Sequence, residues 1–185
     1  VYKDLNGNQR QDEEETGIPD VRVQVGEKAA ITNALGIYRA TVRGKAAEVT
    51  LDMSTIPDGF VFSTPVMETV TIIPHKTHRV DFGLTTQSGI YGIVFYDQNG
   101  DGKPDDGDEF ISKARVVLDG EKTAFSDFEG AYFFENVLPG EHEIAIEMNS
   151  LPITYLPKVK LKNTIITSEG STYVFHIPLD KTKKE

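Results

Sequence analysis

The sequence contains no cysteine and no tryptophan among its 185 residues. Without cysteine there is no disulfide framework, no thiolate metal site and no cysteine nucleophile. Cysteine absence does not decide the compartment, because many secreted bacterial proteins also lack it. Basic residues are few, since 19 Lys and Arg face 29 Asp and Glu and give a net charge of −10. That charge argues against a nucleic-acid partner, because phosphate binding needs a basic face.

Long apolar runs are also missing. No apolar segment approaches the length of a membrane span, so we expect no membrane insertion. No signal peptide is visible, but the opening "VYKD" reads as the middle of a strand. We therefore expect a fragment of a longer protein, in which missing targeting signals mean little. Apolar residues still make up 38% of the sequence, which favours a folded protein over a disordered acidic chain.

The two halves of the chain repeat each other. Residues 1–18 match residues 94–111 at a constant offset of 93, and later matches such as 33–38 with 127–132 and 56–60 with 151–155 shift the offset only to 95. Tandem repeats on this scale indicate two domains. We predict a first repeat over residues 1–86, truncated at its N-terminal strand, and a second over 87–185. The polar stretch 85–89 has the composition of a linker.

Each repeat has the pattern of short strands. Residues 21–25, 48–53, 69–73, 114–118 and 142–148 alternate or run apolar with β-branched residues, and turn residues separate them. In the last of these segments Ile144, Ile146 and Met148 are expected to face the core. No segment has sustained helical periodicity. The sequence therefore predicts an all-β fold of two tandem antiparallel β-sandwiches of the Ig-like or prealbumin-like kind.

An acidic loop, "DQNGDGKPDDGDE" at residues 97–109, has the spacing of a twelve-residue calcium loop. Such loops use side-chain oxygens at positions 1, 3 and 5, a backbone carbonyl at 7, a ligand at 9 and a carboxylate at 12, with Gly at 6 for a sharp turn. The candidate ligands are Asp97, Asn99, Asp101, Lys103 through its carbonyl, Asp105 and Asp108, with Glu109 as a substitute for the short Asp108. The alternative is an acidic solvated turn, whose crowded carboxylates would repel one another.

The first repeat has a weaker version of this loop. Its candidate ligands are Asp4, Asn6, Asn8, Arg10 through its carbonyl, Asp12 and Glu15. Position 6 is Gln9 rather than Gly, so a residue that tolerates the turn poorly must adopt it. Fewer charges also predict weaker binding, and an empty or weak site is the alternative. We expect one calcium ion per repeat, held more securely in the second.

Both loops lie between segments that look like strands, so the sequence does not predict a helix-loop-helix sensor. The expected arrangement is an EF-hand-like calcium loop without its helices. Pro104 at position 8 of the second loop also prevents the usual backbone pairing between twin calcium loops.

Taken together, these motifs resemble the SdrD B-like domain family of calcium-binding, Cna B-type repeats in bacterial surface adhesins. The first repeat contributes "DLNGNQRQDEEETGIPDVRV", "TNALGIY" and "IPDGF", and the second "DQNGDGKPDDGDEFISKARV", "SDFEGAYFF", "LPGEHEI" and "LPITY". Gln9, Asn33 and the missing "LPG" of the first repeat depart from the family pattern, which puts full calcium occupancy of that repeat in doubt.

The resemblance implies a structural spacer or stalk on the cell surface or in a secreted protein, stiffened by calcium. Its partners would be neighbouring domains of the same polypeptide, and the chain would be a monomer. Two other functions stay open. One is an adhesin module that binds a host or matrix protein, and the other is an accessory β-sandwich domain of a secreted carbohydrate-active enzyme. Few exposed aromatic platforms are expected, which disfavours carbohydrate binding.

Other chemistry has little support in the sequence. Cna-type modules often carry a Lys–Asn isopeptide bond, for which Lys3, Asp81 and Asp52 are candidates, but Tyr96 stands at the corresponding place in the second repeat. The four histidines, His75, His78, His142 and His176, are scattered. No nucleophile elbow or phosphate-binding glycine loop occurs, and the carboxylates have calcium-loop spacing. We therefore predict that the protein is not an enzyme.

Overall fold

A computed structural model describes residues 1–182, and the chain divides into two compact units, Val1–Gln87 and Ser88–Glu185. The sequence repeats placed this boundary between residues 86 and 87. The last strand of the first unit, β7 (Gly83–Thr86), and the first strand of the second, β8 (Ser88–Tyr96), are separated in the chain by Gln87. Each unit has a hydrophobic core of its own.

The first unit has two sheets that enclose its core. The four-stranded sheet has the order β3-β2-β4-β6 and the three-stranded sheet the order β1-β7-β5. Valine and leucine side chains of β2 and β4 meet Leu84 of β7 and Phe82, which directly precedes β7, in the core. Besides β7, the strands are β1 (Tyr2–Lys3), β2 (Arg22–Val25), β3 (Lys28–Ile31), β4 (Ala46–Leu51), β5 (Phe60–Phe62) and β6 (Met67–Thr71).

The second unit repeats this plan with longer strands. One sheet has the order β11-β10-β13-β15, and the other has the order β12-β8-β17-β14, with β9 and β16 also paired to β8. Besides β8, the strands are β9 (Glu109–Phe110), β10 (Arg115–Leu118), β11 (Lys122–Phe125), β12 (Ala131–Val137), β13 (Gly140–Ile146), β14 (Tyr155–Pro157), β15 (Lys162–Thr167), β16 (Thr172–Val174) and β17 (Ile177–Lys181).

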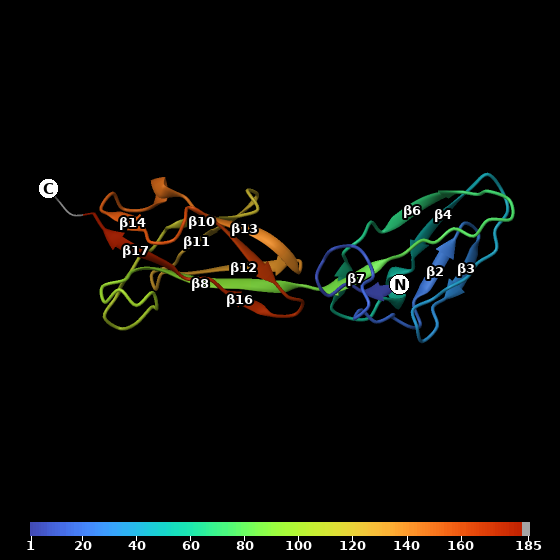
Figure 1. Ribbon diagram of the computed structural model, residues 1–185, viewed down its shortest axis with the longest axis horizontal. Coiled ribbons are helices and arrows are strands. Elements are labelled where there is room, and N and C mark those ends of the chain that lie inside the picture. The colour runs from blue at the N-terminus through green and yellow to red at the C-terminus, as the bar shows by residue number, and fades with distance from the viewer. Residues whose placement is uncertain (183–185) are drawn as a thin grey trace. The chain divides into compact units, whose positions relative to one another are not determined.

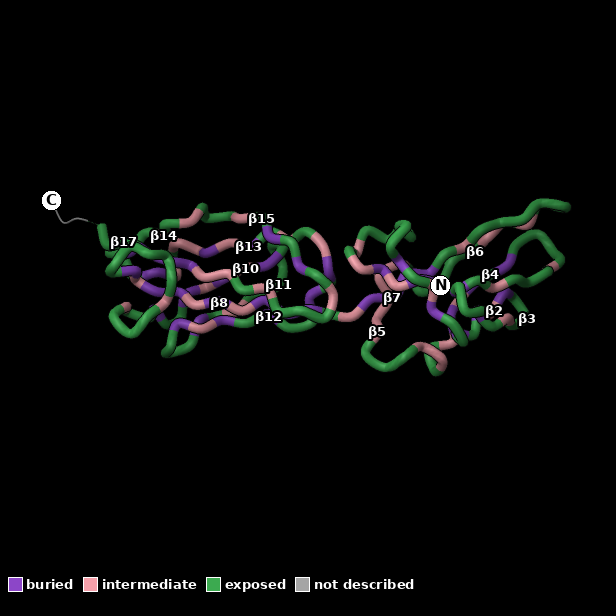
Figure 2. The backbone as a smooth tube through the Cα atoms, turned by 60° about the horizontal axis from the view of Figure 1, so that its bottom comes forward, coloured by how far each residue is buried: buried purple, intermediate pink, exposed green. Residues whose placement is uncertain are grey.

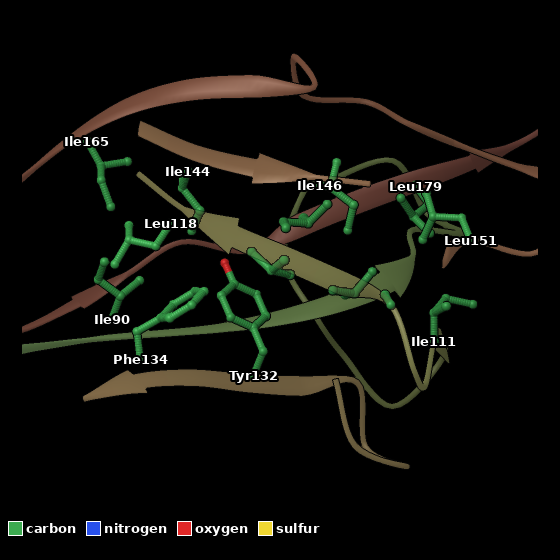
Figure 3. Packing of buried hydrophobic residues seen from close by; sticks show 14 of the residues in the cluster. Ile90, Ile111, Leu118, Tyr132, Phe134, Ile144, Ile146, Leu151, Ile165 and Leu179 are labelled. Carbon is green, nitrogen blue, oxygen red and sulfur yellow. The ribbon is translucent and has the colours of Figure 1, made fainter. Parts of the chain in front are cut away.

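The core of the second unit lies between its two sheets. Ile144 and Ile146 of β13 point inward (Figure 3), as their alternation with polar residues predicts. Met148 packs against the same cluster. Tyr132 and Phe134 enter from β12 with an edge-on ring contact of 6.1 Å between centroids. Buried and exposed residues alternate along the strands in Figure 2, which is the pattern of a sheet with one face against a core.

The predicted all-β class is confirmed. The described helices are two 3-10 turns, η1 (Met53–Thr55) and η2 (Met148–Ser150). One detail differs from the expected antiparallel sheets, because β1 pairs with β7 in parallel, as do β16 and β17 with β8. The first and last strands of each unit are too far apart in sequence for a hairpin, so no tight turn forces them to run in opposite directions. No helix in the described part of the chain is long and apolar enough to cross a membrane.

Acid is expected to destabilise the second unit through His176. The backbone N–H of Ile93 donates to its Nδ1 at 3.2 Å, and burial lowers the pKa of His176 below its ordinary 6.5. A group whose pKa is lower in the folded than in the unfolded state stabilises the fold when the pH is above its unfolded-state pKa. This stability is lost as the pH falls through the folded-state pKa. Melting in chelator should therefore show a smaller loss from pH 7.5 to 5 for His176→Asn, which keeps an acceptor. An equal loss in both proteins would contradict this role.

Candidate metal centre

Each acidic loop is the connection that follows the first strand of its unit. The loop over 97–108 joins β8 to β9, which pair as a hairpin through Phe95 with Phe110 and Tyr96 with Glu109. It lies at the end of the unit where β17 and β14 also lie (Figure 1). The loop over 4–15 follows β1 and is closed in the same way, by a bridge between Tyr2 and Gly17.

Asp97, at position 1 of the second loop, is the buried anchor of that loop. Its side chain is 1% exposed. Oδ1 accepts the N–H of Gly100 at 2.7 Å, and Oδ2 accepts the N–H of Gly102 at 3.0 Å and a proton of Lys158 Nζ at 3.0 Å. Burial acts to raise the pKa of Asp97, but the hydrogen bonds from Lys158, Gly100 and Gly102 outweigh it and hold that pKa below its usual range. The carboxylate is therefore ionised at neutral pH.

Asp108, at position 12, ties the two ends of the second loop together. Its Oδ1 accepts the N–H of Gln98 and its Oδ2 the N–H of Asp105, both at 3.0 Å. Asn99 Nδ2 donates to Asp105 Oδ2 at 2.7 Å, so positions 3 and 9 also meet across the ring. The short Asp side chain is thus long enough to close the loop at position 12.

Glu109 does not join this group. Its carboxylate accepts the O–H of Tyr155 at 2.7 Å and a proton of Lys181 Nζ at 3.1 Å, and these bonds lower the pKa of Glu109. The structure therefore places the predicted substitute ligand outside the loop and gives position 12 to Asp108.

The first loop repeats the five hydrogen bonds that tie positions 1, 3, 9 and 12 of the second loop to their neighbours within the loop. Glu15 fills position 12 and Asp4, which is completely buried, fills position 1. The corresponding bonds are Gly7 N to Asp4 Oδ1 at 2.8 Å, Gln9 N to Asp4 Oδ2 at 3.1 Å, Leu5 N to Glu15 Oε1 at 2.9 Å, Asp12 N to Glu15 Oε2 at 3.1 Å and Asn6 Nδ2 to Asp12 Oδ2 at 2.9 Å. The two repeats therefore share a loop conformation as well as a sequence pattern.

Positions 3 and 5 turn the backbone toward position 7 in both loops. Their side-chain oxygens each accept the N–H two residues ahead, which forms successive side-chain-to-backbone turns. The bonds are Asp101 N to Asn99 Oδ1 at 2.9 Å, Lys103 N to Asp101 Oδ1 at 2.8 Å, Asn8 N to Asn6 Oδ1 at 3.0 Å and Arg10 N to Asn8 Oδ1 at 2.8 Å. The backbone N–H groups of Lys103 and Arg10, at position 7, are the donors that complete these turns.

Gln9 adopts the strained conformation that its position demands, with φ of 65°, where Gly102 has φ of 75°. Gln9→Gly is expected to stabilise the first unit by about 1 kcal/mol, since a non-glycine residue in this region is strained by roughly that amount. The reciprocal Gly102→Gln, at a site with open space around it, should destabilise the second unit by a similar amount. Urea unfolding of both variants in chelator measures the pair, and unchanged midpoints would contradict the strain.

The donor set fits calcium in its chemistry. Every ligand position can offer oxygen, from a side chain or, at position 7, from a backbone carbonyl, and oxygen is what this hard cation takes. Among residues 1–182, however, no group of three or more His, Cys, Asp or Glu side chains is positioned to hold a metal ion. Amide side chains stand among the carboxylates of both loops, and carboxylate oxygens at positions 1 and 12 accept backbone N–H groups. Calcium binding therefore stays a prediction.

The other candidate chemistry is dispersed. Asp81 pairs with Arg79 at 2.7 Å and Asp52 accepts the N–H of Ser54 at the start of η1, so both acids proposed for an isopeptide bond have partners other than Lys3. Among the histidines, His75 and His78 are exposed, and His142 contacts Asp119 Oδ2 and the carbonyl oxygen of Leu138, each at 2.7 Å.

Sequence reasoning missed Lys158. It lies 61 residues from Asp97 in the chain, and no local pattern marks it as part of the loop.

The fold and the loops define a pair of β-sandwich repeats, each with an acidic loop of the same conformation after its first strand. No protein-family model matches the chain. Curated relatives do. Bone sialoprotein-binding protein and serine-aspartate repeat-containing protein E, both of Staphylococcus aureus, are 30% identical to it over 173 residues, which cover 80% of the chain and 15% of each relative. Serine-aspartate repeat-containing protein D of the same organism is 28% identical over 180 residues, 80% of the chain and 13% of the relative.

These relatives are Sdr proteins of Staphylococcus aureus, and the predicted resemblance to SdrD B-like domains is confirmed. The chain spans about 15% of the length of these relatives. Among solved structures, the minor pilin of Streptococcus agalactiae is similar with a TM-score of 0.45 and 9% identity over 98% of this chain and 90% of that one. The major pilin of Bacillus cereus has a TM-score of 0.41 and 15% identity over 74% and 38%. Similarity at this level supports no statement about function.

Proposed function

We propose that the chain is a pair of calcium-stabilised, non-enzymatic spacer repeats in an extracellular bacterial protein, either anchored at the cell surface or secreted. Homology to the Sdr proteins supports a structural role in a larger surface protein. The repeats would then contact neighbouring domains of the same polypeptide and act as a monomer.

The shared hydrogen-bond network of the two loops is the observation that carries this proposal. Both loops bury an acid at position 1 and tie their ends through an acid at position 12. Both oxygens of each of these carboxylates accept a backbone N–H, but these hydrogen bonds do not neutralise the charge, and crowded carboxylates repel one another. A hard divalent cation would remove that repulsion and draw the remaining oxygens inward.

The ion would be held by oxygen atoms from six positions of each loop. In the second loop these are Asp97, Asn99, Asp101, the carbonyl of Lys103, Asp105 and Asp108, and in the first Asp4, Asn6, Asn8, the carbonyl of Arg10, Asp12 and Glu15. Extracellular sites of this class have dissociation constants of about 10⁻⁴–10⁻³ M. Such sites fill where calcium is abundant, which is outside the cell.

Calcium titration by isothermal calorimetry tests the proposal. We expect two bound ions per 185-residue chain and a higher melting temperature in calcium than in chelator. Magnesium at the same concentration is the control, because it demands a smaller octahedral cage and gives up its water reluctantly. Heat of binding absent at millimolar calcium would refute the metal site.

A second candidate function, a module that binds a protein ligand, is favoured by one observation. Phe125 and Phe133 line a shallow groove with Tyr91, and Phe128 lies near them in sequence with 82% of its surface exposed. The expectation of few exposed aromatic side chains was therefore wrong for the second unit. Exposed aromatic side chains are typical of binding surfaces. Loss of ligand adhesion in Phe125→Ser with Phe133→Ser, at unchanged melting temperature, would favour this function over a pure spacer.

A further inference from the structure

A lysine from outside the second loop holds its position-1 carboxylate. Lys158 directly follows β14, and its Nζ lies 3.0 Å from Asp97 Oδ2 and 3.3 Å from the carbonyl oxygen of Asp97. The Asp97 side chain is 1% exposed and that of Lys158 is 27% exposed. The carboxylate of the pair is therefore removed from water while Lys158 reaches it from an exposed position, and burial of the carboxylate makes the ion pair stronger than one at an open surface.

Ser63 stands at the equivalent place in the first unit. The backbone shows the correspondence, because Lys158 N donates to the carbonyl of Pro178 at 2.8 Å and Ser63 N to that of Gly83 at 3.0 Å. The position-1 residues are also equivalent, since each donates its N–H to a leucine carbonyl of the unit's last strand.

The side chain of Ser63 brings no charge to this place. Its buried Oγ has no hydrogen-bond partner in the described part of the chain. Asp4 instead accepts the backbone N–H groups of Gly7 and Gln9. The first loop therefore has no counterpart of the Lys158 ammonium at the Ser63 position.

This difference changes the charge balance of the two loops. The second loop has four carboxylates at its ligand positions and the first has three. The Lys158 ammonium offsets one of the four, so the more acidic loop offers a calcium ion no more net negative charge than the other.

We propose that Lys158 sets the calcium affinity of the second loop, because its ammonium and the calcium ion compete for the Asp97 carboxylate. This inference rests on the proposed function. In the absence of metal, Lys158 keeps the second loop in place, and calcium must displace it. The first unit, with Ser63, depends on the ion. The acidity of the loops predicts tighter calcium binding by the second loop. Because of Lys158, we expect the second loop to bind calcium no more tightly than the first.

Reciprocal exchange of the two residues in the full chain tests the inference. Calcium is titrated while NMR follows the amide signals of Gly102 and Gly7, which report the second and first loops separately. For Lys158→Ser we expect the dissociation constant of the second loop to fall about tenfold and the melting temperature of the second unit in chelator to fall. For Ser63→Lys we expect weaker calcium binding by the first loop and a higher melting temperature in chelator.

Lys160→Ser is the matched control, since it removes the same charge from an exposed position two residues away. If the wild-type chain binds calcium and Lys158→Ser does not change the affinity of the second loop, the inference is overturned while the proposed function stands. An equal change in affinity with Lys160→Ser would have the same meaning. A wild-type chain that binds no calcium would overturn the proposed function together with the affinity role of Lys158.

Discussion

Calcium is expected to raise the melting temperature of the second unit, and Asp97→Ala with Asp101→Ala to abolish that rise. Asp97 is the buried anchor that also holds the N–H groups of Gly100 and Gly102. At a calcium concentration one hundred times the dissociation constant, binding stabilises the folded state by about 2.7 kcal/mol. For a domain of this size that corresponds to roughly 10–20 °C in melting temperature.

The control for this prediction removes two charges of the same sign elsewhere. Asp106 lies in the loop at position 10, outside the ligand positions, and Glu121 lies outside the loop, and both are exposed. Asp106→Ala with Glu121→Ala should keep most of the calcium response. A full response in the Asp97 and Asp101 double variant would show that the ion binds somewhere else.

The largest loss of stability is expected from Gly92→Ala in β8. A Cβ atom at this position would lie 2.0 Å from the carbonyl oxygen of Phe175 and 2.5 Å from the Tyr132 ring. The same carbonyl accepts the Tyr132 O–H at 2.5 Å, so relief of the clash would also break a buried hydrogen bond. Since backbone and a core ring must both move, we expect a loss of about 4 kcal/mol or more, enough to unfold the second unit.

Gly120→Ala separates this clash from a backbone effect. Gly120 has φ of 71° and nothing within 4 Å of an added Cβ atom, so alanine there should cost only about 1 kcal/mol. Urea unfolding of both variants, followed by amide NMR to tell the two units apart, measures the difference. Equal midpoints for the two variants would mean that β8 and β12 can move apart to admit the added methyl group without lowering the free energy of unfolding.

The sequence predicted what depends on local patterns. Ile144 and Ile146 alternate with polar residues and lie in the core, and the spacing of Asp97, Asn99 and Asp101 marks a loop that does fold into a closed ring. Similar local patterns can still give different structures. Residues 127–132 lead into β12, which pairs with β8, whereas the matching stretch 33–38 leads into no strand, and the counterpart of β8 in the first unit is the short β1.

Contacts between distant segments could not be predicted in this way. The bond from Lys158 to Asp97 and the parallel pairing of β17 with β8 depend on how the whole unit closes. The exposure of Phe125 and Phe133 has the same origin, because an aromatic residue in a strand predicts burial until the positions of the edge strands are known.

The parallel pairing of first and last strands has a mechanical consequence. In the second unit the chain enters through β8 and leaves through β17, and the two run side by side in the same direction. Tension applied at the two ends of the unit therefore loads the hydrogen bonds between these strands in shear, all at once rather than one after another. Asp97 donates its N–H to Leu179 of β17 at 3.1 Å. The acidic loop is thus joined to the end of the strand pair that bears the load, where the proposed calcium ion would resist rupture most directly.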